Sequence, residues 1–285
     1  MLFLAEVLNE PNHFFFADWI GAYRPAGYRS LLQFSGLKVF SNGVDLKIAH
    51  ITDIHSNDFI TKSECLDAMD NFKIILADIK SRGITKIVLT GDYGDPNDFN
   101  ALLMMVKSFN LEYEYILGNH DDFDHYRNND DLGNRSKPSG IFFSQTTEDA
   151  VFIFLDTRLH SLDTTQLNYM DNICREVGER KIIIFMHHPV LDCGDTFMDL
   201  NFPLSNRDEA AARLYKLGKK VVIFSGHYHT NHFIEKNNIK QYVTMSTLFQ
   251  LKKNTDSIEI NSFDFGYRII DIGCSIETDI VQFSN

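Results

Sequence analysis

The chain has 285 residues, of which 44% are hydrophobic, so it can bury a full core as one large α/β domain or as two smaller domains. Its net charge of −12 argues against a nucleic-acid polymer or backbone as the main partner, but a small phosphate substrate stays compatible because bound cations would reverse the local field. The four cysteines form no CxxC pair and predict reduced thiols in a cytoplasmic protein, and we expect neither a signal peptide nor a membrane-spanning segment.

Residues 1–45 differ from the rest of the chain by their density of aromatic side chains. These aromatic residues are Phe14, Phe15, Phe16, Trp19, Tyr23, Tyr28, Phe34 and Phe40. Turn residues interrupt the stretch at 24–27 and 41–43, and it contains no catalytic pattern. We predict an N-terminal appendage that packs through its aromatics on a main domain at residues 46–285. A homodimer contact, or a lid over the site, is the alternative.

From residue 46 onward the hydrophobic pattern becomes regular. Strands are predicted at 46–52, 84–90, 113–117, 141–145, 151–155, 181–186, 220–224 and 267–272, with a hairpin formed by 233–236 and 239–245. Helices are predicted at 63–81 and 96–109. A third helix is predicted to open with a capping box at Asp163 and Gln166 and to end near Gly178, and a fourth is predicted to be capped by Asn206 and to stop at Gly218. Residues 124–138 are polar and predict a surface loop. Because strands and helices alternate, the fold class is α/β.

Polar residues follow directly after five of these strands. The five turns are Asp53-Ile54-His55, Gly91-Asp92, Gly118-Asn119-His120-Asp121, His187-His188-Pro189 and Gly226-His227-Tyr228-His229. Ligands of α/β sheets bind beyond the carboxyl ends of the strands, so strands lying side by side would bring these turns together. Each motif alone is an ordinary turn, but five of them in this order predict one shared site.

The side chains that would converge are two aspartates, one asparagine and at least four histidines. A single four-coordinate zinc ion with an open position needs fewer ligands than this. The set suits two divalent metal ions bridged by one carboxylate, each with room for water or substrate. The mixture of imidazole, carboxylate and amide ligands excludes a purely thiolate site but does not choose among the metals.

The order of these motifs resembles the signature of the calcineurin-like metallophosphoesterases over residues 46–272. Within that superfamily the chain is most similar to the bacterial class III 3′,5′-cyclic-nucleotide phosphodiesterase branch, which includes cAMP phosphodiesterases. The landmarks that support this branch are Met198-Asp199, Pro203-Leu204-Ser205-Asn206, Ser246-Thr247, Gln250 and Gly266-Tyr267-Arg268. The resemblance implies a four-layer αββα sandwich, of the α/β (α+β) class, in which two mixed β-sheets are flanked by helices.

The resemblance also implies a role for each residue of the site. Metal site one would consist of Asp53, His55, Asp92 and His229. Metal site two would consist of Asp92, Asn119, His187 and His227, so that Asp92 bridges the two ions. The ions would be manganese, iron or zinc. His120 would be the catalytic histidine beside the substrate phosphate, with Asp121 supporting it, and Asn119 would also contact the substrate.

The reaction implied by the resemblance is the in-line attack of a metal-bridging hydroxide on phosphorus, with His120 protonating the leaving oxygen. Protein phosphatases of this superfamily carry arginines beside the Gly-Asp and Gly-Asn-His motifs, where they grip a dianionic phosphate. Tyr93 and Leu117 occupy those places here, which favours a monoanionic phosphodiester. We therefore expect a phosphodiesterase for a small diester, with 3′,5′-cyclic AMP as one candidate and linear diesters as others. A phosphomonoesterase or nuclease on the same scaffold, or a non-enzymatic binding protein, are the alternatives.

Several other polar residues are interpreted as structural. His188 should support the site or pack structurally, with substrate contact as the alternative, and His50 should be structural. The histidines expected to titrate in solvent are His13, His125, His160 and His232. Asp95 and Asp98 are expected in turns or in a helix cap. Asp156 is expected to be structural, with a position beside the metal ligands as the alternative.

Overall fold

The structure is a computed structural model that describes residues 46–285 with the exception of residues 58, 65, 128–134 and 195. The predicted appendage at residues 1–45 lies outside the described residues, so its role and the domain boundary at residue 46 stay predictions. Part of the polar loop predicted at 124–138 also lies outside them.

The first of two large sheets has the strand order β15-β14-β1-β2-β3. Its strands are β1 (Leu46–Ile51), β2 (Lys86–Leu89), β3 (Glu112–Tyr115), β14 (Phe265–Ile272) and β15 (Ile276–Phe283). Strands β1, β2 and β3 are parallel to one another, whereas β14 is antiparallel to both β1 and β15. The three parallel strands therefore end at one edge of the sheet, where the turns at Asp53, Asp92 and Asn119 begin.

The second sheet has the strand order β10-β11-β9-β8-β7-β6. Its strands are β6 (Phe143–Thr146), β7 (Ala150–Leu155), β8 (Lys181–Met186), β9 (Val221–Ser225), β10 (His232–Lys236) and β11 (Ile239–Val243). The four inner strands are parallel and the two edge strands are antiparallel to their neighbours. Two short strand pairs join β4 (Ser136–Lys137) to β5 (Gly140–Ile141) and β12 (Gln250–Leu251) to β13 (Ile260–Ser262).

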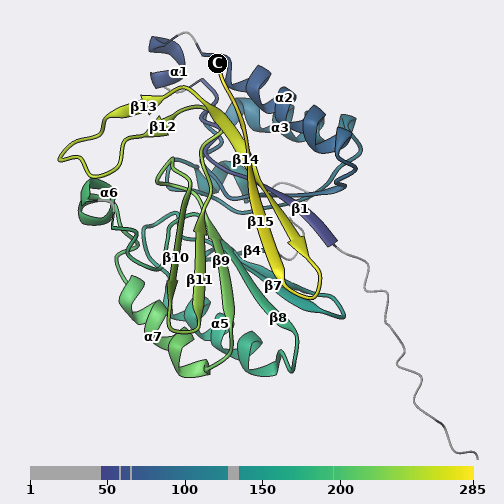
Figure 1. Ribbon diagram of the computed structural model, residues 1–285, viewed down its shortest axis with the longest axis vertical. Helices are drawn as coiled ribbons and strands as arrows, with labels where there is room; N and C mark the ends of the chain where they lie inside the picture. Colours follow the sequence, from purple (N-terminus) through teal and green to yellow (C-terminus); the bar gives the residue numbers. More distant parts are fainter. Residues whose placement is uncertain (1–45, 58, 65, 128–134, 195) are drawn as a thin grey trace, which may run out of the picture. The chain divides into compact units, whose positions relative to one another are not determined.

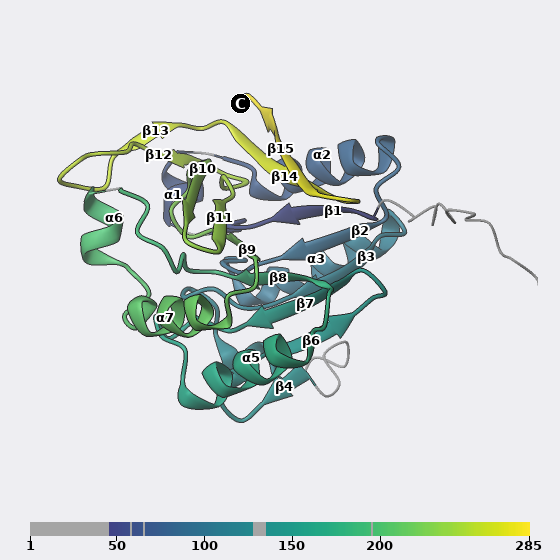
Figure 2. The same cartoon turned by 60° about the horizontal axis from the view of Figure 1, so that its bottom comes forward.

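Helices cover the outer faces of the two sheets. The described helices are α1 (Phe59–Ser63), α2 (Ala68–Ser81), α3 (Pro96–Ser108), α4 (Phe123–Tyr126), α5 (Thr164–Glu176), α6 (Thr196–Asn201) and α7 (Arg207–Leu217), of which the four longest cover the sheets. Helices α2 and α3 lie against the first sheet, and α5 and α7 lie against the second (Figures 1 and 2). This arrangement confirms the predicted sandwich of two mixed sheets flanked by helices. None of the described helices is both long and apolar enough to cross a bilayer.

The second sheet is apolar on both faces because its alternate residues enter two different cores. In β8, Ile183 and Phe185 belong to the core shared with the first sheet, whereas Ile182 and Ile184 belong to the core under α5 and α7. Parallel strands buried on both faces require such continuous apolar runs. Across the sheet, stacked rings of Phe154, Phe185, Phe224 and Tyr242 lie on the inner face with centroid distances of 5.3, 5.5 and 5.4 Å between neighbours.

The predicted helix signals are mostly confirmed by hydrogen bonds at the helix ends. The Gln166 N–H donates to Asp163 Oδ1 at 2.8 Å at the start of α5, and the Asn97 N–H donates to Asp95 Oδ1 at 2.9 Å at the start of α3. Gly218 ends α7 with a left-handed φ of 64°. Asp95 is therefore a helix cap, as expected from the sequence.

Three details of the predicted elements were wrong. The helix predicted at 63–81 begins only at Ala68, because Asp67 caps it by accepting the Asp70 N–H at 2.9 Å. Asn206 precedes α7 but makes no cap hydrogen bond; its side chain instead bonds both backbone groups of Leu162. The last strand, β15, was missed because polar side chains interrupt its apolar residues.

Candidate metal centre

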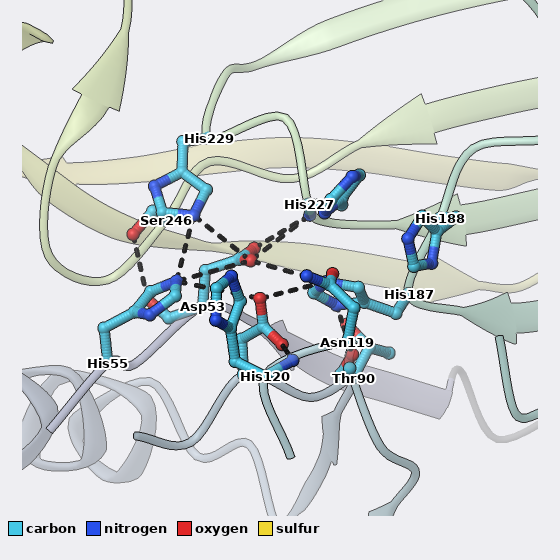
Figure 3. A network of polar contacts seen from close by, with 12 residues as sticks. Asp53, His55, Thr90, Asn119, His120, His187, His188, His227, His229 and Ser246 are labelled. Carbon is cyan, nitrogen blue, oxygen red and sulfur yellow. Dashed lines mark hydrogen bonds and ion pairs between the residues drawn. The ribbon is translucent and has the colours of Figure 1, made fainter. Parts of the chain in front are cut away.

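The seven predicted metal ligands lie together where the carboxyl ends of the parallel strands of both sheets meet. Asp53 and His55 follow β1, Asp92 follows β2 and Asn119 follows β3, while the second sheet contributes the turns after β8 and β9. Figure 3 shows the Asp53 carboxylate between His55 and His229 on one side and His187 and His227 on the other. The sequence motifs alone thus predicted residues that the fold does bring into contact.

Five of these ligands have a backbone conformation that residues other than glycine seldom adopt. The φ angles are +58° at Asp53, +51° at His55, +57° at Asp92, +68° at His227 and +46° at His229. Such left-handed residues cost free energy and persist where the surrounding structure holds them, typically at functional sites. At Asp53 the holding contacts are visible, since the hydroxyls of Ser246 and Thr247 both donate to its carbonyl, at 2.9 and 3.2 Å.

Two glycines allow the turns after β2 and β3 to touch. A Cβ at Gly91 would lie 2.0 Å from the Gly118 nitrogen, and a Cβ at Gly118 would lie 2.1 Å from Asp92 Oδ1. No side chain fits at either place without displacing the Asp92 carboxylate or the backbone. The glycines therefore set the position of Asp92 relative to the Asn119 turn.

The first group of candidate ligands consists of Asp53, His55 and His229, all of them buried. His229 Nε2 lies 3.3 Å from Asp53 Oδ1, and His55 Nε2 lies 3.1 Å from His229 Nε2. Two imidazole nitrogens at this separation need a proton or a cation between them. Their atoms also all lie within 4.8 Å of one another, as ligands of a common ion must.

The second group consists of Asp92, His187 and His227, also buried. His187 Nε2 lies 3.2 Å from Asp92 Oδ2 and 3.1 Å from Asn119 Oδ1, so Asn119 joins this group. Asp92 Oδ2 also lies 3.8 Å from His55 Nε2, in the first group. Asp92 is thus placed between the two groups.

Backbone carbonyls fix which ring nitrogen of two histidines faces the centre. His187 Nδ1 donates to the Thr90 carbonyl at 2.9 Å, which leaves Nε2 for Asp92. His227 Nε2 donates to the Phe202 carbonyl at 3.0 Å, which leaves Nδ1 as the free acceptor. Metal-binding histidines characteristically hold their second nitrogen in this way.

The charges of the buried carboxylates show that the centre requires nearby positive charge. Burial works to raise the pKa of Asp92, but the rings of His187, His55 and His120 together outweigh burial and hold that pKa well below its usual range. His187 is the counterpart: burial lowers its pKa, yet the Asp92 carboxylate raises it to about 9. Burial also works to raise the pKa of Asp53, and His229 and His187 lower it below its usual range. Divalent cations would meet the same requirement, and carboxylate, imidazole and amide ligands suit manganese, iron or zinc.

Asp121 differs from the expectation that it supports the His120 ring. Its Oδ2 accepts the N–H groups of Asp92 and Gly118 at 2.8 and 2.7 Å, and its Oδ1 accepts the Tyr93 N–H at 2.9 Å. Burial, followed by the Asp92 carboxylate, raises the pKa of Asp121 to about 7, against the lowering effect of these three N–H groups. Within the described part of the chain it makes no hydrogen bond to His120. Asp121 therefore ties the two ligand-bearing turns together, because buried backbone donors need an acceptor.

Replacing Asp121 with alanine should lower the free energy of unfolding of the protein and weaken its binding of metal ions. Three buried N–H groups would lose their acceptor at about 1–3 kcal/mol each, so we expect a loss of at least about 3 kcal/mol in the free energy of unfolding. Urea unfolding measures this loss. Asp124→Ala is the matched control because its side chain is 76% exposed. Equal stability of the two variants would contradict the role of Asp121.

His120 is exposed, whereas six of the seven predicted ligands are buried and Asn119 is partly buried. Its backbone N–H donates to Asp92 Oδ1 at 2.9 Å, and its ring lies edge-on to His55 with 5.4 Å between the centroids. A side chain at this position can reach both the centre and a molecule that enters from solvent.

His188 and His160 form a hydrogen-bonded pair behind the second group. His188 Nδ1 lies 2.9 Å from Thr157 Oγ1, and His188 Nε2 lies 3.1 Å from His160 Nδ1. Both ring nitrogens of His188 are engaged in these contacts, and its supporting role stays a prediction. The expectation that His160 titrates in solvent was wrong, because the fold places it within 4.8 Å of ligand atoms of His188 and His227. No local signal in the sequence marks this contact.

His50 and Asp156 follow the structural interpretation. His50 is fully buried between the hydroxyls of Thr90 and Thr244, at 2.8 and 2.7 Å. Asp156 accepts the N–H groups of Ile141 and Arg158, at 2.9 and 3.0 Å. The remaining placements are these: His125 is exposed, His232 contacts Lys253 and Asp98 bonds Asn57, while His13 lies outside the described residues.

Comparison with known proteins agrees with this geometry. The sequence model described as calcineurin-like phosphoesterase matches residues 46–231. A protein of Fibrobacter succinogenes named "probable cyclic nucleotide phosphodiesterase" is 27% identical over 243 residues, which are 84% of this chain and 94% of that protein. The 3′,5′-cyclic adenosine monophosphate phosphodiesterase CpdA of Escherichia coli K12 is 24% identical over 242 residues, 80% of this chain and 85% of that protein. A dimetal phosphatase of Danio rerio has a similar fold, with a TM-score of 0.58 at 11% identity over 84% of this chain and 99% of that one.

Proposed function

The chain belongs to the calcineurin-like phosphoesterase family, and from this premise we propose that it is a phosphodiesterase with two metal ions that hydrolyses a small phosphodiester. The observation that carries the proposal is the position of Asp92, which lies 3.2 Å from His187 of one ligand group and 3.8 Å from His55 of the other. A carboxylate between two groups of ligands suits a pair of ions better than a single ion.

Each of the two ligand groups would hold one of the proposed ions, and Asp92 belongs to both groups. Asp53, His55, His229 and Asp92 would hold one ion, and Asp92, Asn119, His187 and His227 the other. When bound, two such ions supply positive charge for the phosphoryl oxygens and lower the pKa of a coordinated water. Manganese, iron and zinc all accept these ligands.

The protein's own residues would orient the ester and manage the proton of the leaving group. The Asn119 amide can bind a phosphoryl oxygen as well as face the centre. His120 is exposed at the same opening and can donate a proton to the departing oxygen, a step that typically contributes about 10²–10⁴-fold to the rate. Thr90 and Phe202 would keep His187 and His227 in the orientation that the centre needs.

The preference for a diester over a monoester is inferred from two positions, residues 93 and 117, whose side chains are buried. Tyr93 is 1% exposed and donates its hydroxyl to the Ile116 carbonyl at 2.6 Å, and Leu117 is fully buried. Neither place offers the arginine that would bind a second negative charge on a monoester. This supports a monoanionic diester, and the names of the two relatives support a 3′,5′-cyclic nucleotide such as cyclic AMP.

Parallel assays with bis(p-nitrophenyl) phosphate and p-nitrophenyl phosphate test this preference. Manganese-loaded protein should hydrolyse the diester with at least about tenfold higher kcat/KM, which corresponds to about 1.4 kcal/mol in transition-state stabilisation. The same protein stripped with EDTA is the control for metal dependence. A preference for the monoester would replace the diesterase proposal with a phosphatase, whereas diester preference would lead to a panel of cyclic nucleotides.

A further inference from the structure

A second concave site lies at the opposite end of β8 and β9 from the metal centre. A cavity of about 830 Å³ opens where these strands begin, beside the turn between β14 and β15. Small-molecule sites typically have volumes of about 300–1,000 Å³. Because His187 and His227 follow the other ends of the same strands, roughly 20 Å separates the cavity from the centre at about 3.3 Å per residue.

The cavity is lined by an excess of cationic side chains, although the chain as a whole has a net charge of −12. The charged lining residues are Arg180, Lys181, Lys219, Lys220 and Lys240 on the positive side and Glu179 and Glu235 on the negative side. A concave surface lined by one sign of charge concentrates the field and attracts counter-ions.

Two of these cations have a structural task that explains them without a ligand. Arg180 donates to the Val177 carbonyl at 3.2 Å, and Lys219 donates to the Gly178 carbonyl at 3.3 Å. These carbonyls lie just beyond the end of α5, where the helix leaves acceptors without partners. The three remaining lysines need a different explanation.

Lys181, Lys220 and Lys240 lie on the same face of the second sheet. The register pairs Ile182 with Val221, which places Lys181 beside Lys220, and it pairs Lys240 with Val222. Side chains alternate between faces, and Ile183 and Val222 enter the core between the sheets. The three lysines therefore share one face of the sheet at the end where the cavity opens, and all three line the cavity.

Protein groups neutralise this cluster only weakly. Lys240 Nζ lies 3.8 Å from Glu235 Oε2, with both side chains about half exposed, and exposed pairs of this kind contribute little. In the part of the chain that the structure describes, the side chains of Lys181 and Lys220 make no hydrogen bond or ion pair. Like charges side by side on one face of a sheet repel each other, so a bound anion would stabilise the arrangement.

We propose that this cavity binds a small organic molecule that carries phosphate, with Lys181, Lys220 and Lys240 contacting the phosphate oxygens. Lysine ammonium groups are point charges well suited to phosphate. Val222 and Ile276 give the cavity apolar wall for the organic part of the ligand. The site is separate from the metal centre and does not depend on the proposed reaction.

Calorimetric titration of the full chain with ATP, as a phosphate-bearing organic probe, tests the proposal. EDTA keeps the protein free of metal. Without metal ions the carboxylates of the candidate metal centre repel ATP, so that binding at the centre does not contribute to the signal. We expect saturable binding of one ATP per chain that weakens as ionic strength rises. The double substitution Lys181→Ala/Lys220→Ala should weaken it at least tenfold. Lys73→Ala/Lys80→Ala on α2 removes the same charge from exposed positions and should leave the affinity unchanged.

Alkylation of Cys274 provides a second readout that needs neither metal nor activity. This thiol is free and exposed and lines the cavity. Bound ATP should therefore slow its reaction with iodoacetamide, and mass spectrometry of the peptide that contains Cys274 measures the rate of that reaction. The protection should persist in Lys73→Ala/Lys80→Ala and vanish in Lys181→Ala/Lys220→Ala. Absence of saturable binding, equal affinity in both double variants, or unprotected Cys274 at saturating ATP would each overturn the proposal.

Discussion

Replacing Asp92 with alanine should remove both metal ions and reduce diester hydrolysis to the level of EDTA-treated protein. Asp92 is the carboxylate between the two ligand groups, 3.2 Å from His187 Nε2 and 3.8 Å from His55 Nε2. Its loss would leave each group with one ligand fewer and no charge between the ions. Elemental analysis of the dialysed variant measures the metal-to-protein ratio directly.

Two comparisons make the Asp92 result specific. Asp124→Ala removes an exposed carboxylate and should retain the full metal content, so a loss there would indicate a general effect of charge. Far-ultraviolet circular dichroism of Asp92→Ala should stay native, because the backbone N–H groups of residue 92 and Tyr93 keep their acceptor in Asp121. A folded variant that still holds two ions per chain would refute the bridging position of Asp92.

Replacing His120 with alanine should lower kcat by about 10²–10⁴-fold while leaving the metal content unchanged. His120 is exposed, its backbone N–H donates to Asp92 Oδ1 at 2.9 Å, and its ring lies edge-on to His55 with 5.4 Å between the centroids. Alanine keeps that backbone contact. His125→Ala, five residues along and also exposed, is the matched control and should keep wild-type turnover.

The leaving group separates proton donation from other roles of His120. A nitrophenolate departs without a proton more readily than an alkoxide does, so the loss should be larger for a 3′,5′-cyclic nucleotide than for bis(p-nitrophenyl) phosphate. An equal loss for the two substrates would assign His120 to charge stabilisation instead. Unchanged turnover on both would remove it from the mechanism.

The turns that contain the candidate ligands restrain one another through contacts between distant parts of the chain. Asp53 is held in its left-handed conformation by hydroxyls that come from residues 246 and 247, nearly two hundred positions away in the chain. Asp92 is fixed by Asp121 and by contact with Gly118. The strain of the centre is thus stored in several turns that restrain one another.

The sequence by itself predicted most of the strands, the turns that follow them and the seven candidate ligands. Strands β1, β2, β8 and β9 are short and mostly apolar, β3 leads into the apolar residues Ile116 and Leu117, and polar residues follow each of them, so this pattern is local. Since parallel strands end at one edge, the order of the motifs along the chain is enough to predict that they converge. The cap at Asp163 is also local, because its partner Gln166 is three residues away.

Only the tertiary structure decided how those ligands are held and oriented. The carbonyl that orients His187 is 97 residues away in the chain, and the one that orients His227 is 25 residues away. The same holds for the task of Asp121, which binds backbone groups of another turn, and for His160, which meets His188 across 28 positions. Every residue has a backbone carbonyl, so the residue type does not reveal which carbonyl will orient a histidine. Contacts between distant turns depend on how the two sheets pack, and a local sequence pattern does not predict that packing.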